Sequence, residues 1–104
     1  MKKQGYLYWG NVSDNTIITG KRPFLVLSVD QMNHSSVIVA PLFSVNGLLA
    51  THIPISNETY PIKNGVIKLE RISTIKSDYL SEEICKLREE EIIKVKEVLN
   101  SILL

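Results

Sequence analysis

The stretches KRPFLVLSVD (residues 21–30) and VIVAPLFS (residues 37–44) carry the strongest structural signal in this chain. Phe24–Val29 and Val37–Leu42 are nearly continuous apolar runs, which predicts two strands that are buried on both faces. The polar residues 30–36 between them are typical of a turn. Arg22 stands at the start of the first strand, directly before Pro23, whose ring fixes the backbone φ angle. The pattern therefore predicts a rigid hairpin with a cation at its rim, where a site can be held firmly.

The rest of the chain adds three predicted strands and one helix. Aromatic residues at 5–12 predict a first strand, and the alternating residues 51–55 predict a short edge strand, because Pro54 has no N–H to donate. Residues 66–75 predict the last long strand, whereas 81–87 are ambiguous. Apolar residues at helical spacing predict a helix over 88–103, with three glutamates in its first turn, where the dipole favours anions. A loop is predicted at 13–20 and a turn at Asn46-Gly47.

Composition and charge limit the class of protein. The 104 residues, 44% of them apolar and 22% charged, predict a single soluble domain spanning 1–104. The net charge is +1, but residues 1–80 carry eight Lys or Arg against five Asp or Glu, so the cations lie with the strands. The single cysteine predicts a protein without disulfides in the reducing cytoplasm. No apolar run reaches about 18 residues, so no membrane span is predicted. No apolar segment follows the N-terminal lysines, so no signal peptide is predicted.

The side chains that carry chemistry narrow the function further. The glycines are scattered and form no phosphate loop, and the sequence has neither a zinc spacing of His and Cys nor a pair of strand-end carboxylates. Cations, hydroxyls and one histidine remain around the hairpin. Guanidinium groups bind phosphate in a fork and stabilise charge on its oxygens, and the ribose 2′-hydroxyl can be the internal nucleophile. This set suits a phosphodiester and predicts neither a metal nor a cofactor.

The order of these motifs resembles the MazF/PemK (Kid) toxins of type II toxin–antitoxin modules. Their pattern "RPVVVIS-D…N…VIVAPITS" is similar to residues 22–44, their opening "RGDIYWVDL" shares Gly5, Tyr8 and Trp9, and their "VILLDQIRTIDKSRL" is similar to residues 66–80. The resemblance implies a mainly β fold, an SH3-like β-barrel of the CcdB/PemK/MazF type with a C-terminal α-helix. It also implies a homodimer that cuts single-stranded RNA through a 2′,3′-cyclic phosphate, and a separate antitoxin that displaces loop 13–20 from the RNA groove.

The residues and the resemblance together give a candidate site. Arg22 takes the position of the family's catalytic arginine, and Ser44 is the hydroxyl next to the position of its catalytic threonine. These two are the predicted catalytic residues. The residues predicted to bind RNA are Lys21, Phe43, Thr51, His52, Arg71, Ser73 and Thr74.

Two of these positions depart from the family pattern. Phe43 occupies the threonine position and has no hydroxyl. A bulge at Pro41 could re-aim Ser44, Phe43 could stack on a base, or Phe43 could fill the groove and leave little nuclease activity. Ser73 occupies a family arginine position. Side chains alternate along a strand, so residues 71 and 73 face the same side, and Arg71 could place its guanidinium there, about 7 Å further back. The alternative is that Arg71 is a surface residue paired with a neighbouring acid.

A second hypothesis keeps the scaffold without the cleavage. The chain would then be a catalytically degenerate MazF-like binding protein or a CcdB-like gyrase poison that acts by protein binding. The gyrase option is weaker, because CcdB-type poisons act through a Trp-Gly-Ile end and this chain ends in Ile102-Leu103-Leu104. Packing is the simpler interpretation of Trp9 and His52 when each is taken alone.

Overall fold

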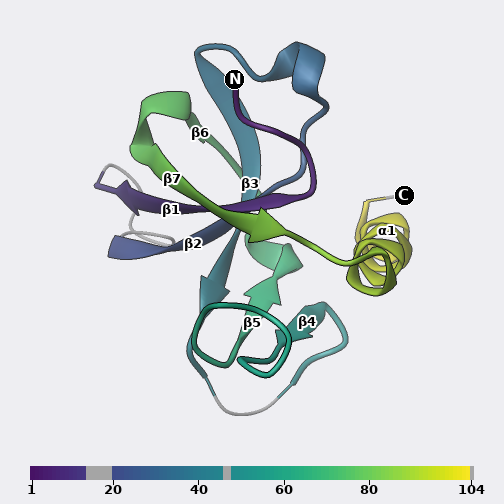
Figure 1. Ribbon diagram of the computed structural model, residues 1–104. Helices are drawn as coiled ribbons and strands as arrows, with labels where there is room; N and C mark the ends of the chain where they lie inside the picture. The colour runs from purple at the N-terminus through teal and green to yellow at the C-terminus, as the bar shows by residue number, and fades with distance from the viewer. Residues whose placement is uncertain (14–19, 46–47, 104) are drawn as a thin grey trace.

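A strongly bent antiparallel sheet with one C-terminal helix forms the protein (Figure 1). The computed structural model describes residues 1–13, 20–45 and 48–103. The strands of this part of the chain are β1 Tyr6–Val12, β2 Gly20–Val26, β3 Ser36–Phe43, β4 His52–Ile55, β5 Gly65–Lys68, β6 Ser73–Lys76 and β7 Leu80–Lys86. Three 3-10 turns, η1 Asp30–Met32, η2 Leu69–Arg71 and η3 Ser77–Tyr79, and the helix α1 Glu89–Ile102 complete it.

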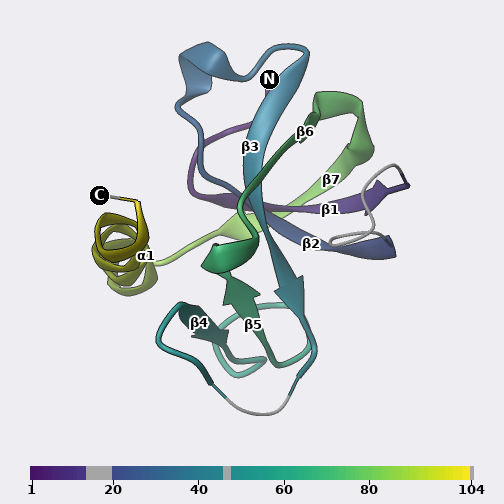
Figure 2. The same ribbon diagram turned by 180° about the vertical axis from the view of Figure 1, so that it is seen from behind.

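Strand β3 is the centre of the sheet. The strand order is β4-β5-β3-β2-β1-β7, and β6 also pairs with β3. One edge of β3 pairs with β2, while the other edge pairs first with β6, over Ser36–Val39, and then with β5, at Leu42 and Phe43. A strand that serves two partners on one edge must bend between them, and Figure 2 shows β3 curving from β6 towards β5. The predicted mainly β, barrel-like fold with a C-terminal helix is confirmed.

The predicted hairpin is buried on both faces. Val37 and Val39 of β3 pack in one apolar cluster, together with Phe24, whereas Ala40 and Leu42 pack in the other. Successive side chains of a strand point to opposite faces, so apolar contacts on both sides require an uninterrupted apolar run. This explains why residues 24–26 and 39–42 contain almost no polar side chain.

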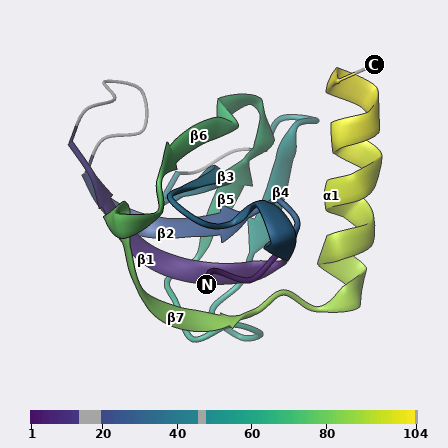
Figure 3. The ribbon, with the colours of Figure 1, turned by 90° about the horizontal axis from the view of Figure 1, so that it is seen from above.

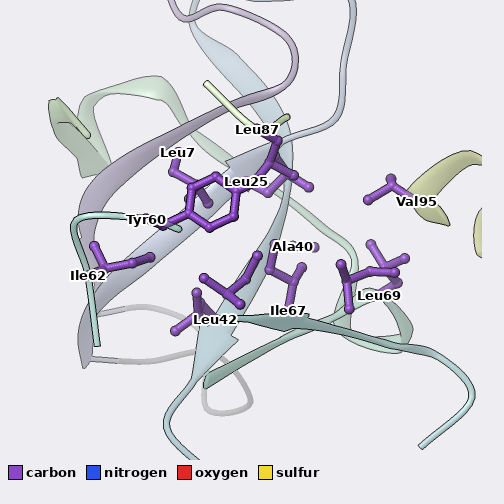
Figure 4. Close-up of a cluster of buried hydrophobic side chains, with 12 residues drawn as sticks. Leu7, Leu25, Ala40, Leu42, Tyr60, Ile62, Ile67, Leu69, Leu87 and Val95 are labelled. Carbon is purple, nitrogen blue, oxygen red and sulfur yellow. The ribbon is translucent and has the colours of Figure 1, made fainter. Parts of the chain in front are cut away.

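Helix α1 covers one side of the sheet, next to β4 (Figure 3). Val95 is its buried residue, 4% exposed, and half-buried apolar residues on the same stripe pack on the cluster that contains Leu7 and Leu25. Figure 4 shows Val95 at one end of this cluster and Tyr60 and Ile62 at the other. No helix in the described ranges is long and apolar enough to cross a membrane.

The prediction of one long strand over residues 66–75 is wrong. The 3-10 turn η2 divides it into β5 and β6, and Leu69, the first residue of η2, is fully buried. The turn is what allows one chain segment to pair with two halves of a bent β3. The ambiguous segment 81–87 belongs to β7, which pairs with β1. The predicted Asn46-Gly47 turn and residues 14–19 of the predicted loop lie outside the described residues.

Candidate functional site

A groove with a volume of about 860 Å³ lies beside the end of the central hairpin. One wall comes from strands β1 to β3 and the residues that follow β3, and the other comes from the segment between β4 and β5. Four predicted site residues line the first wall: Lys21, Arg22, Phe43 and Ser44. The opposite wall includes Asn57, Tyr60, Pro61 and Lys63, which the sequence analysis did not select.

Two cations meet at the ring of Phe43. The guanidinium carbon of Arg22 lies 4.1 Å from the ring centroid, and Nζ of Lys68 lies 4.3 Å from it. Arg22 comes from β2 and Lys68 from β5, the strands that pair with opposite edges of β3, and both cations lie over the ring of Phe43. Cations are attracted to the negative faces of an aromatic ring. Phe43 therefore holds Arg22 against the sheet.

Burial removes part of the hydration of the Arg22 guanidinium. Its side chain is half-buried, and the loss of water lowers the pKa of the guanidinium from its ordinary value. An arginine nevertheless keeps its charge in proteins. A cation that has lost part of its hydration gains more from an arriving anion than a fully hydrated one. Lys21, the residue before Arg22, is exposed, with its Nζ 6.0 Å from the Trp9 ring.

Ser44 shares the groove with Phe43 although it follows Phe43 directly. Strand β3 ends at Phe43, so the alternation of side chains no longer applies at Ser44, which is exposed. The alternative of a bulge at Pro41 is wrong, because β2 and β3 keep an unbroken register from Val39 to Pro41.

Thr51 and His52 bind the carboxylate of Glu70. The Thr51 hydroxyl donates to Oε1 of Glu70 at 2.8 Å, and His52 Nε2 lies 2.9 Å from Oε2. His52 Nδ1 accepts from the backbone N–H of Leu49 at 3.2 Å, so Nε2 carries the proton that is donated to Glu70. These contacts fasten the start of β4 to η2. Neither residue is among those that line the groove.

The remaining predicted RNA-binding residues lie elsewhere on the sheet. Arg71 is in η2, and Ser73 and Thr74 begin β6, where they pair with Val39 and Ile38. None of them lines the groove. The expectation that Arg71 and Ser73 point to one face of a strand is wrong, because η2 replaces the strand at 69–71. Their role in RNA binding stays a prediction.

Tyr60 connects the groove to the helix. Its ring lines the groove, and its hydroxyl donates to Glu91 and accepts from the backbone N–H of Arg88 at 2.9 Å. Burial, followed by the hydrogen bond to Glu91, raises the pKa of Tyr60 to about 12. The tyrosine anchors segment 56–64 to the start of α1. No local sequence signal marks this contact, because residues 60 and 91 meet only in the folded chain.

Within residues 1–13, 20–45 and 48–103, no three His, Cys, Asp or Glu side chains gather so that they could hold a metal ion. Cys85, in β7, is half-buried, and burial raises the pKa of its thiol. A raised pKa leaves little of the reactive thiolate at neutral pH.

Comparison with known proteins identifies the family. Residues 3–103 match the family model described as "PemK-like, MazF-like toxin of type II toxin-antitoxin system". The chain belongs to this family. The sequence resemblance is thereby confirmed, and the protein is a MazF-like toxin of a type II toxin–antitoxin system. A search of curated proteins gave no match.

Solved structures share the fold of this MazF-like toxin at low identity. MazF from Deinococcus radiodurans is 19% identical with a TM-score of 0.84, covering 98% of this chain and 96% of its own. An endoribonuclease in complex with its cognate antitoxin, from a mycobacterial species, is 18% identical with a TM-score of 0.83, covering 99% and 95%. Mycobacterium tuberculosis toxin MazF-mt6 is 20% identical with a TM-score of 0.78, covering 95% and 97%.

Proposed function

We propose that this toxin is an endoribonuclease that cuts single-stranded RNA without a metal ion. The observation that carries the proposal is Arg22, a partly desolvated guanidinium held on an aromatic ring in the wall of a groove. Such a group is suited to the negative charge that grows on phosphate oxygens during cleavage. Family membership supports the same reaction, and one structural relative carries the name endoribonuclease with its cognate antitoxin.

The proposed reaction uses the RNA as its own nucleophile. The 2′-oxygen attacks the adjacent phosphorus, the bond to the 5′-oxygen breaks, and the products are a 2′,3′-cyclic phosphate and a 5′-hydroxyl. One proton leaves the 2′-hydroxyl and one is delivered to the 5′-oxygen, so the reaction is balanced without a co-reactant. Arg22 binds the non-bridging oxygens, and Ser44 donates a hydrogen bond. The protein contributes position and charge stabilisation.

The other groove residues are proposed to hold the strand. Lys21 is exposed beside Trp9 and suits a flanking phosphate. Trp9 is half-buried and offers aromatic surface in the groove wall, where an unpaired base can stack. The active form is proposed to be a homodimer. A cognate antitoxin is proposed to inhibit it, because one relative of this fold is found in complex with its cognate antitoxin. Light scattering of the pure protein tests the dimer.

Phe43 favours one competing function. A phenylalanine brings no hydrogen-bonding group to the wall next to Arg22, which is the composition expected of a groove that binds RNA without cutting it. In that case the protein would be a degenerate member of the family that stops growth by binding alone.

Incubation of the pure protein with a long single-stranded RNA in EDTA separates the two functions. The wild type is expected to give site-specific cuts that end in a cyclic phosphate. Arg22→Ala is expected to lose about 10²- to 10³-fold in rate, as when one charge-stabilising donor is removed. Arg88→Ala is the matched control, because Arg88 is exposed and its contact is with Glu90 on the helix.

Circular dichroism of both variants must match the wild type. Cuts that persist in Arg22→Ala would refute the assigned role. Intact RNA together with arrested growth would favour the binding protein.

A further inference from the structure

Lys68 is a cation that the sequence analysis did not select, and it contacts the ring of Phe43 although it is not among the residues that line the groove. It lies at the end of β5, opposite His52 in the pairing of β4 and β5, and its side chain is half-buried. Its Nζ lies over the ring of Phe43 rather than in bulk water. None of the described carboxylates lies within ion-pair distance of Lys68.

We propose that Lys68 is the second phosphate-binding cation of the site and acts with Arg22 across Phe43. This inference rests on the proposed function, because it assigns a further residue to the same phosphate. Phe43 cannot donate a hydrogen bond, so the donors beside Arg22 must come from its neighbours. The ammonium group of Lys68 has three of them.

The distances fit one phosphate. Both cationic centres are within 4.3 Å of the same ring centroid, so they are at most about 8 Å apart, the sum of the two distances. Two charge-assisted hydrogen bonds of about 2.8 Å each, with the width of the phosphate between them, span such a gap. The lysine stem is flexible, and its ammonium can move from the ring to the anion when the anion arrives.

The arrangement also explains the aromatic ring at this position. Two like charges so close together repel each other, and the negative faces of Phe43 attract both while the groove is empty. A base that stacks on Phe43 must compete with these two cations for the ring. The part of the ring that meets a ligand is its electropositive edge, which itself favours an anion.

Binding of a short single-stranded RNA with 2′-fluoro riboses tests the proposal without any cleavage. Lys68→Met is expected to weaken binding about 10- to 100-fold, the value of one hydrogen bond to a charged group. The logarithm of the association constant falls linearly with the logarithm of the salt concentration, and in Lys68→Met this slope should be less steep by about 0.7, the change for one phosphate contact on a single strand. Lys68→Arg should retain most of the affinity. Lys96→Met removes an exposed helical charge and should change neither quantity.

Cleavage of unmodified RNA in one turnover is the second measurement. Lys68→Met is expected to reduce its rate by at least the factor by which it weakens binding, and Lys68→Arg to restore it. Wild-type binding by Lys68→Met overturns the proposal, even if the enzyme cleaves RNA. A wild type that binds but never cleaves refutes the proposed function alone, and the binding series still decides the role of Lys68. A wild type that does not bind RNA refutes both.

Discussion

Removing the hydroxyl of Tyr60 should loosen the groove wall from the helix. Tyr60→Phe keeps the ring, which is 5% exposed and packs in the apolar cluster, and deletes only the contacts to Glu91 and the Arg88 N–H. A hydrogen bond to a charged group contributes about 1.5–3 kcal/mol. We expect the free energy of unfolding to fall by about 2 kcal/mol at pH 7.

The pH dependence of the same variant follows from the direction in which the pKa of Tyr60 is shifted. Folding raises the pKa of Tyr60, so its contribution is fully present below its unfolded pKa of 10.0 and disappears as the pH rises towards 12. At pH 11 the unfolded tyrosine is mostly ionised and the folded one is not, which removes about 1.4 kcal/mol of the wild-type stability. The difference between wild type and Tyr60→Phe should therefore shrink by that amount between pH 8 and pH 11.

Urea unfolding followed by the fluorescence of Trp9, the single tryptophan, measures both quantities. Protein concentration must be constant, because the stability of a dimer depends on it. Tyr6→Phe is the matched control, since Tyr6 is half-buried and its ring faces Lys3 rather than a buried acceptor. Equal stabilities of wild type and Tyr60→Phe at pH 7, or a difference that stays constant up to pH 11, would refute this account.

Two further variants test how the site is supported. In Gly65→Ala, the new Cβ would lie 2.5 Å from the carbonyl oxygen of Phe43, so the backbone must shift. We expect the free energy of unfolding, measured with urea, to fall by about 1–3 kcal/mol. The backbone NMR chemical shifts at Phe43 should also change. Burial raises the pKa of Glu70, but hydrogen bonds from His52, from the backbone N–H of Glu70 itself and from Thr51 outweigh it and leave the pKa lowered. Its contribution is therefore present above its ordinary pKa of 4.5 and lost below it, so the stabilities of wild type and Glu70→Gln should converge as the pH falls from 6 to 3.

The central hairpin could be predicted because one-dimensional signals determine it. An apolar run that is buried on both faces, bounded by Arg22 and the turn at 30–36, leaves few other structures open. Helix α1 could be predicted for the same reason, because its apolar residues recur at helical spacing in the sequence. The 3-10 turn η2 was missed because an apolar residue such as Leu69 fits a strand and a buried turn equally well. What decides between them is the bend of β3, which is a tertiary feature.

The site was predicted only in part, for a related reason. Arg22, Lys21, Phe43 and Ser44 lie on or next to the hairpin, and they meet in one groove because the hairpin itself brings them together. The 56–64 wall is held at that groove by the contact of Tyr60 with α1, and Lys68 reaches the ring of Phe43 through the pairing of β5 with β3. Thr51 and His52 were selected for their chemistry, but Glu70, which binds both, stands nearly twenty residues later in the chain.

The two edge strands at the ends of the strand order, β4 and β7, disfavour pairing with a strand of another chain. At one end, β4 presents the exposed Pro54, which offers no N–H to an additional strand. At the other end, β7 carries Ser81, Glu82 and Glu83 on exposed positions. Sheet borders that contain proline or charges resist edge-to-edge aggregation. A protein with these borders should remain dispersed when it is overproduced, and substitutions at Pro54 or Glu82 are where amyloid-like association would first be expected.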